Sequence, residues 1–226
     1  MVDYQWAVLA QASGGKPLSY WEMLVWPGGG YIGAIIWLLS VVTVALIIHY
    51  FISVRRGNVM PDLVREQIQG MFDNKQYREA IEVTASEPSM LSYIVHAGLG
   101  EAAHGYLAME QAMAEAADER TSDLLRRVEW LNLIGNISPM LGLLGTVWGM
   151  ILAFMEIVKA RGMPPPENLA ASIGIALVTT LLGLAVAIPA LSVFAVIRNR
   201  IDSLSNEAMA AAEELIATFR PAAKGA

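Results

Sequence analysis

Three long stretches of the chain lack charged side chains altogether. Asp, Glu, Lys and Arg are absent from Met23 to Val54, from Trp130 to Met155 and from Asn168 to Ile197. Since an α-helix rises about 1.5 Å per residue, roughly 20 apolar residues suffice to cross the hydrocarbon core of a bilayer. Each stretch is long enough for one crossing, so the pattern predicts an all-α integral membrane protein with three transmembrane helices.

The predicted spans divide the chain into seven consecutive segments. These are an outer N-terminal segment (1–30), the first span (31–54), a cytoplasmic helical region (55–129), the second span (130–156), an outer loop (157–168), the third span (169–197) and a cytoplasmic C-terminal helix with its tail (198–226). No Gly or Pro lies between Leu107 and Leu131 or between Ile197 and Arg220. Because Gly and Pro are the usual helix breakers, we expect two of the three helices to extend into a cytoplasmic helical stalk.

The sides of the membrane follow from the basic residues next to each span, because cytoplasmic loops are enriched in Lys and Arg. One set of span ends is flanked by Arg55, Arg56, Arg126, Arg127, Arg198 and Arg200, and the other only by Lys16, Lys159 and Arg161. The bias predicts a periplasmic N-terminus and a cytoplasmic C-terminus. The aromatic residues near the outer end of the first span fit an interfacial belt: Trp21, Trp26 and Tyr31.

Turn residues divide the cytoplasmic region into four predicted helices. They cover Pro61–Met71, Tyr77–Ser86 and Ser89–His104, with the last beginning at Leu107. Asp73-Asn74, Glu87-Pro88 and Gly105 mark the breaks between them. The outer loop contains three consecutive prolines, Pro164 to Pro166, so we expect a stiff extended turn there.

The composition narrows the class of function. Of the 226 residues, 55% are hydrophobic and 16% are charged, well below the roughly 25% that is typical of a soluble domain. The net charge of −6 comes without a basic face or arm, so no nucleic-acid partner is expected. There is no cysteine, and the spans contain no Ser/His pair, paired Asp or metal-ligand set, so we predict neither an enzyme, nor a cofactor, nor a metal site.

Small residues and prolines recur in the second and third spans. Gly142, Gly145 and Gly149 would let another helix approach closely, and Gly183 has the same property in the third span. Pro139 and Pro189 each remove a backbone donor and predict bends in their helices. These glycines and prolines are therefore predicted to serve helix packing and bending.

Three threonines leave two interpretations open. Thr146, Thr179 and Thr180 could each bond the preceding turn of their own helix, as threonines in membrane helices commonly do. They could instead line a polar path through the membrane. No Asp, Glu, Lys, Arg or His lies from Trp130 to Met155 or from Asn168 to Ile197, and the first span has only His49, near its cytoplasmic end. Because proton relays normally need an intramembrane ionisable group, a proton path would require a carboxylate from a partner.

Two motifs carry a family resemblance. The sequence SPMLGLLGTVWGM, from Ser138 to Met150, resembles the second-helix signature of the TolQ/ExbB/MotA proton-channel family. The sequence ALVTTLLGLAVAIPA, from Ala176 to Ala190, resembles the third-helix signature of the same family. Their order, spacing and topology, together with the chain length, are most similar to the ExbB/TolQ branch, since MotA chains usually have four spans and a larger cytoplasmic region.

The resemblance implies a function and a set of partners. Such proteins form homopentamers around a pair of single-span ExbD/TolR-type subunits, each of which carries a membrane Asp that takes up and releases protons. The assembly acts as a stator-like motor in the bacterial inner membrane. It uses protons as the coupling ion and transmits energy to a TonB/TolA-like envelope-spanning protein in biopolymer or protein transport.

The resemblance also implies roles for individual residues. The pore-lining threonines of the family match Thr146 and Thr180, and Thr179 is a weaker candidate. Many relatives carry a Glu five residues before the third-helix threonine, where this chain has Ile175. A passive membrane scaffold or assembly subunit without proton conduction remains the alternative. The envelope process that is driven, whether ExbB-like uptake or TolQ-like maintenance, also stays open.

Overall fold

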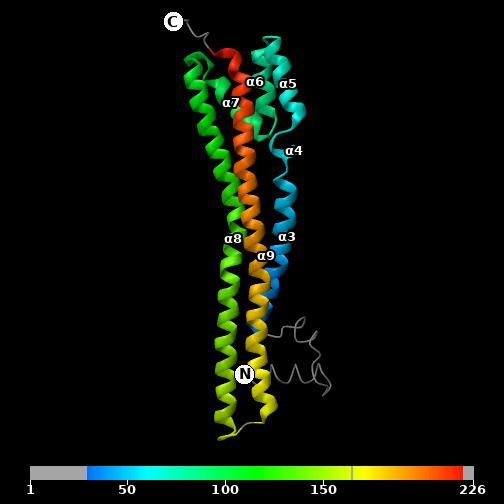
Figure 1. The fold of residues 1–226 in the computed structure, drawn as a ribbon, viewed down its shortest axis with the longest axis vertical. Coiled ribbons are helices and arrows are strands. Elements are labelled where there is room, and N and C mark those ends of the chain that lie inside the picture. Colours follow the sequence, from blue (N-terminus) through cyan, green and yellow to red (C-terminus); the bar gives the residue numbers. More distant parts are fainter. Residues whose placement is uncertain (1–29, 164, 221–226) are drawn as a thin grey trace. The chain divides into compact units, whose positions relative to one another are not determined.

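The computed structural model describes residues 30–163 and 165–220, and every regular element among them is helical. The helices are α3 (Gly30–Ser53), α4 (Arg56–Val59), α5 (Asp62–Asp73), α6 (Tyr77–Ser86), α7 (Met90–Gly100), α8 (Tyr106–Lys159) and α9 (Pro166–Ile216), with short 3-10 turns at Ala102–His104 and Ala217–Phe219 (Figure 1). Of these, α3, α8 and α9 each contain a stretch long and apolar enough to cross a membrane. The prediction of an all-α membrane protein with three spanning helices is confirmed.

The described residues form two compact units. The first, called the membrane unit below, contains residues 30–47 and Leu131–Val193. The second, called the polar unit, contains Ile48–Trp130 and residues 194–220. Helices α3, α8 and α9 contribute residues to both units. The predicted outer segment, with Lys16, Trp21 and Trp26, lies outside the described residues.

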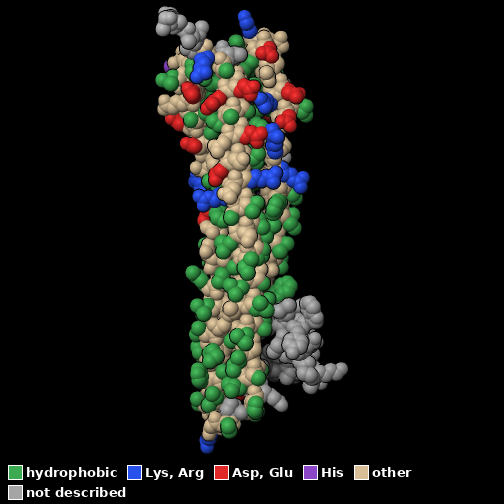
Figure 2. Space-filling view, viewed as in Figure 1, with side chains coloured by type: hydrophobic (Ala, Val, Ile, Leu, Met, Phe, Trp, Pro, Cys, Tyr) green, Lys and Arg blue, Asp and Glu red, His purple; other side chains and the backbone are tan. Residues whose placement is uncertain are grey.

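The core of the membrane unit draws one buried side chain from each of its three helices. Ile36 of α3, Ile134 of α8 and Val186 of α9 pack together, and partly buried Leu39 and Leu141 adjoin them. The outward-facing residues of this unit are mostly large and apolar, and Figure 2 shows hydrophobic side chains covering its visible face. This surface suits lipid or other membrane helices rather than water.

Helices α8 and α9 meet in the membrane unit along a row of small, buried residues. This small-residue seam consists of Gly135, Ser138, Gly142, Gly145 and Gly149 on α8, and of Ser172, Ala176, Thr179, Gly183 and Ala190 on α9. Successive members on α8 are three or four residues apart, so they lie on one face of the helix. With side chains this short, the two backbones can approach closely.

The distances across the seam show how close that approach is. A Cβ atom added to Gly183 would lie 2.6 Å from the carbonyl oxygen of Ser138. One added to Gly149 would lie 2.9 Å from the carbonyl oxygen of Ser172, and one on Gly142 would lie 3.1 Å from that of Thr179. In each case the neighbour is backbone and cannot move aside by rotating a side chain.

The polar unit is held by larger side chains and by ion pairs. Its buried residues include Ile68, Phe72, Leu91, Ile94, Met109, Met113, Ile201 and Ile216. Thr121 of α8 and Ser205 of α9 share a hydrogen bond of 2.6 Å. Arg56 pairs with Glu207 at 2.8 Å, and the charged side chains visible in Figure 2 gather over this unit.

The predicted elements of the polar unit recur with shifted ends. Pro61 precedes α5 as its cap instead of lying inside it, and α7 ends at Gly100 rather than His104. The 3-10 turn that follows ends at Gly105, whose φ of 97° is favoured by glycine and separates the turn from α8. Helix α4 has only four residues, too few to produce a recognisable periodic pattern in the sequence.

The loop between α8 and α9 is shorter than the predicted outer loop of 157–168. Helix α8 continues to Lys159, and α9 already begins at Pro166. Proline is well tolerated in the first turn of a helix because its missing N–H would have no intrahelical acceptor there. The third proline of the run therefore starts a helix, whereas the sequence predicts that it belongs to an extended turn.

Candidate functional site

Thr179 lies inside the small-residue seam. Its side chain is fully buried, and its hydroxyl donates to the carbonyl oxygen of Ala176 at 2.8 Å, one turn earlier in α9. The side chain fills the space beside Gly145, where an added Cβ would collide with the Thr179 Oγ1 atom. Packing and a local backbone hydrogen bond thus account for the surroundings of this residue.

Thr180, the next residue, has a different environment. It is half-buried, and its hydroxyl donates across the helix pair to the carbonyl oxygen of Gly142 at 3.3 Å. Consecutive side chains on an α-helix point about 100° apart, so the Thr180 side chain points in a different direction from that of Thr179. Thr180 therefore lies at the edge of the seam, where it links α9 to α8.

Thr146 lies on α8, about one turn beyond Gly142. It is also half-buried, and its hydroxyl donates to the carbonyl oxygen of Leu143 at 2.7 Å. Four residues of helix correspond to a rise of about 6 Å, so Thr146 lies about one turn along α8 from Gly142, whose carbonyl oxygen accepts from Thr180. Both half-buried threonines therefore lie close to Gly142 along the helix, whereas the fully buried Thr179 lies within the seam.

The hydroxyl protons of the three threonines are thus used in two ways. Thr146 and Thr179 bond the preceding turn of their own helix, as threonines in membrane helices often do. Thr180 instead bonds the neighbouring helix. Since a hydroxyl has one proton and two lone pairs, Thr146 and Thr180 each retain the capacity to accept a further hydrogen bond.

A polar face on α8 continues from Thr146 toward the polar end of the helix. Asn136 is exposed, and its amide nitrogen donates to the backbone oxygen of Asn132 at 2.8 Å and to its side-chain oxygen at 2.9 Å. At about 100° per residue, Asn132, Asn136 and Thr146 lie within about 80° of one another around α8. Exposed amides on an otherwise apolar membrane surface require polar neighbours, such as water or another protein helix.

Both prolines of the spans lie inside unbroken helices. Pro139 is half-buried within α8 and Pro189 is exposed within α9. Each leaves one carbonyl of the previous turn without its usual N–H donor. The bends predicted at these prolines stay predictions, because the helices continue through both positions.

One polar feature of the molecule is not predicted from the sequence. A cavity of about 310 Å³ lies in the polar unit, and two arginines of α8, Arg120 and Arg127, are among its lining residues. Their spacing of seven residues, two helical turns, was the available signal, because it places both on one face. The predicted role of Arg127 in membrane orientation did not suggest a cavity.

Comparison with known proteins gives a consistent result. A sequence model of the MotA/TolQ/ExbB proton channel family matches residues 86–209. Biopolymer transport protein exbB1 of Vibrio cholerae is 48% identical over 62 residues, which are 27% of this chain and 27% of the relative. The Tol-Pal system protein TolQ of Haemophilus influenzae is 33% identical over 97 residues, 43% of this chain and 42% of the relative.

One alignment extends over most of both proteins. Biopolymer transport protein ExbB of Salmonella typhimurium is 32% identical over 189 residues, which cover 74% of this chain and 71% of the relative. The other two alignments are shorter, and each covers less than half the length of the Vibrio or Haemophilus protein. The match to the family includes the small-residue seam and all three threonines.

Proposed function

Because the chain belongs to the MotA/TolQ/ExbB proton channel family, on its ExbB/TolQ branch, we propose that it forms a proton path together with a single-span partner. The partner, of ExbD/TolR type, supplies a membrane Asp that carries the proton. The complex transmits the energy to a TonB/TolA-like protein that spans the envelope. One charge crossing 100 mV releases about 2.3 kcal/mol, which is an adequate source for such movement.

The observation that carries this proposal is the lack of an acid in the charge-free stretches of the second and third spans, combined with the placement of two hydroxyls. From Trp130 to Met155 and from Asn168 to Ile197 the sequence has no ionisable side chain, so the titrating group must come from elsewhere. Thr146 and Thr180 lie at the edge of the seam with lone pairs available. A protonated carboxyl of the partner, or water, would find acceptors there.

The geometry also distinguishes among the three threonines. In our proposal Thr146 and Thr180 line the path, whereas Thr179 serves the packing of α8 against α9, because its side chain is fully buried beside Gly145. Ile175, which lacks any proton-binding group, leaves the polarity of this region to the hydroxyls. The coupling ion is the proton, and no other cofactor is required.

The assembly and its location complete the proposal. The chain is a multi-pass membrane protein of ExbB/TolQ type. We place it in the bacterial inner membrane as a homopentamer, with its N-terminus periplasmic and its C-terminus cytoplasmic. The arginines next to the spans support this orientation, since basic residues are retained on the cytoplasmic side.

Proton flux into liposomes tests the proposal. The chain is reconstituted with and without its single-span partner, and flux is read with a pH-sensitive dye under an imposed potential. We expect flux only with the partner, and its loss when the membrane Asp of the partner becomes Asn. An assembled complex of verified composition that conducts no protons, even with its envelope-spanning protein bound, would favour a passive scaffold.

A further inference from the structure

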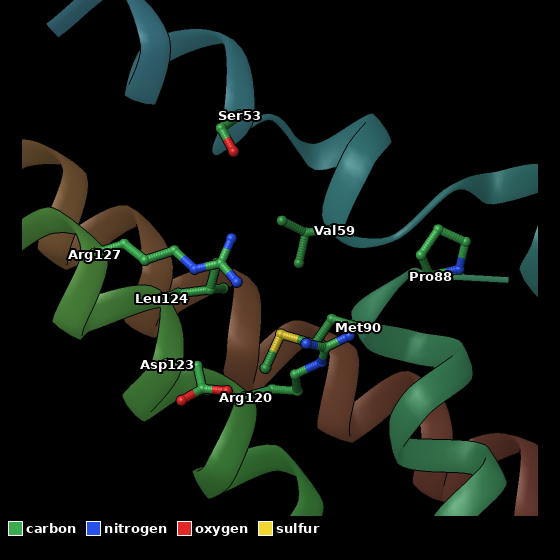
Figure 3. A pocket seen from close by; sticks show the side chains of 8 residues that line it. All are labelled: Ser53, Val59, Pro88, Met90, Arg120, Asp123, Leu124 and Arg127. Atoms are coloured by element: carbon green, nitrogen blue, oxygen red, sulfur yellow. The ribbon is translucent and has the colours of Figure 1, made fainter. Parts of the chain in front are cut away.

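The cavity in the polar unit has the size of a small ligand site. Its volume of about 310 Å³ lies at the lower end of the roughly 300–1,000 Å³ that is usual for ligand pockets. Eight residues line it: Ser53, Val59, Pro88, Met90, Arg120, Asp123, Leu124 and Arg127 (Figure 3). Val59 and Met90 are buried, while Ser53, Pro88 and Arg127 are exposed, so the cavity has a buried floor and reaches the surface.

The charge of the cavity is set by α8. Arg120 and Arg127 lie two turns apart on one face of this helix, and Asp123 lies between them. Asp123 is paired with Arg126 at 3.3 Å, which offsets its negative charge. Among the described residues, neither Arg120 nor Arg127 has a carboxylate within 4.0 Å, so both guanidinium groups retain capacity for an anion.

Arg120 is also held in position. Its guanidinium carbon lies 4.6 Å from the centroid of the Tyr93 ring, a favourable cation–π distance. The phenol of Tyr93 donates to Glu119 at 2.8 Å, and this hydrogen bond raises the pKa of Tyr93.

The Arg127 side chain extends from α8 toward the space beneath Ser53, as Figure 3 shows. The backbone beside it is fixed as well, since the Tyr50 hydroxyl donates to the carbonyl oxygen of Arg127.

These features match the chemistry of a phosphate group. Guanidinium groups bind phosphate oxygens through paired, charge-assisted hydrogen bonds, and the Ser53 hydroxyl adds a further donor at the rim. Val59, Met90 and Leu124 provide an apolar wall that suits the carbon atoms attached to a phosphodiester.

The residues that line the cavity lie next to spanning segments in the sequence, and this favours one source of phosphate. Ser53 is the last residue of α3, the first spanning helix, and Arg127 precedes the charge-free stretch beginning at Trp130 by three residues. Phospholipid headgroups lie where spanning segments leave the hydrocarbon, and basic pockets there bind anionic lipids. We propose that this cavity binds a phosphate-bearing anion, with the headgroup of an anionic membrane lipid as its source. The proposal does not depend on proton conduction.

Lipid retention by the purified full-length protein tests the proposal. Membranes containing phosphatidylglycerol and phosphatidylcholine are solubilised, and the lipid bound per chain is counted by native mass spectrometry. Arg120→Gln and Arg127→Gln should each lower phosphatidylglycerol retention about fivefold, with phosphatidylcholine unchanged. Arg198→Gln is the matched control, because it removes one exposed arginine next to a span without touching the cavity.

A third variant and a titration with inorganic phosphate complete the experiment. Ser53→Asp introduces a negative charge at the exposed rim and should lower retention similarly, with unchanged thermal unfolding, so a folding defect in an arginine variant does not end the test. Inorganic phosphate is titrated in parallel and followed by ³¹P nuclear magnetic resonance. Phosphate binding that needs both arginines, without preference for phosphatidylglycerol, would support the same site with a soluble source. Equal retention of lipid and equal phosphate binding in wild type, Arg120→Gln, Arg127→Gln and Ser53→Asp would overturn it.

Discussion

Helices α8 and α9 pack against each other in both units of the molecule, but the side chains that they bury differ in size. In the membrane unit their contact consists of Gly, Ala, Ser and Thr, and backbone meets backbone within van der Waals distance. In the polar unit the same two helices bury large side chains, such as Ile201 and Ile216, together with small ones, such as Ala117, Ala208 and Ala212, and they share the Thr121–Ser205 hydrogen bond.

The difference reflects the surroundings that each contact must compete with. In water, burying large apolar side chains is itself favourable, so the polar unit gains from Ile, Leu and Met. In lipid, apolar side chains gain nothing by leaving the solvent, and association depends on close van der Waals packing. The membrane unit therefore needs the smallest residues at the contact and can leave the large ones facing outward.

The largest effect is expected from adding one carbon atom to the seam. In Gly183→Ala the new Cβ would lie 2.6 Å from the backbone oxygen of Ser138, so the helices must separate. We expect a loss of about 3 kcal/mol in stability and a failure to assemble, measured by thermal unfolding and by size-exclusion chromatography in detergent. Gly70→Ala is the matched control, since nothing lies within 4 Å of its Cβ, and it should be neutral or slightly stabilising.

The next effect separates function from packing within the membrane unit. Thr180→Val and Thr146→Val should reduce partner-dependent proton flux at least tenfold while leaving assembly intact, because each removes an acceptor at the seam edge. The hydroxyl of Thr179 donates to the carbonyl oxygen of Ala176 in a buried position, so Thr179→Val should cost about 1 kcal/mol of stability and leave flux near that of wild type. Full flux in both Thr146 and Thr180 variants would remove them from the path.

A glycine in the polar unit should respond more mildly than Gly183. In Gly98→Ala the new Cβ would lie 2.7 Å from the Cγ and Sδ atoms of Met113, which belong to a flexible side chain. Because methionine can adopt another rotamer, we expect a loss of about 1 kcal/mol, read from chemical unfolding. A loss as large as that of Gly183→Ala would show that the polar unit is packed as rigidly as the seam.

The smallest effect concerns the ion pairs of the polar unit. Arg56→Gln removes a pair with Glu207 whose two side chains are both more than 40% exposed. We expect a change of about 0.5 kcal/mol or less, which disappears at high salt. If the loss is larger and independent of salt, the pair contributes through something other than surface electrostatics.

Much of the fold was accessible from the sequence because its signals are local. The three charge-free stretches predicted the spanning helices, and the lack of Gly or Pro after Leu107 and Ile197 correctly indicated that α8 and α9 continue beyond the spans. The errors lie at helix ends. Pro166 begins α9, for example, although a run of three prolines also fits an extended turn.

The arrangement of the candidate site was accessible only in part. The sequence identified the three threonines, but the difference between Thr179 and Thr180 depends on which face of α9 meets α8. The two threonines are neighbours in one motif, and the motif does not show which of them faces α8. The cavity at Arg120 and Arg127 was inaccessible because it also requires Ser53 and Val59 from a distant part of the chain.

The seam has a consequence for how the sequence can vary. Any replacement of glycine adds at least a Cβ atom, and at Gly142, Gly149 and Gly183 that atom meets backbone. At Gly149 and Gly183 the atom would lie within 3.0 Å of a backbone oxygen, so we expect every substitution there to be harmful, and at Gly142, where the distance is 3.1 Å, we expect alanine to be the best tolerated replacement. In a saturation scan, these three positions should accept far fewer substitutions than the outward-facing leucines close to them, with Gly183 the least tolerant.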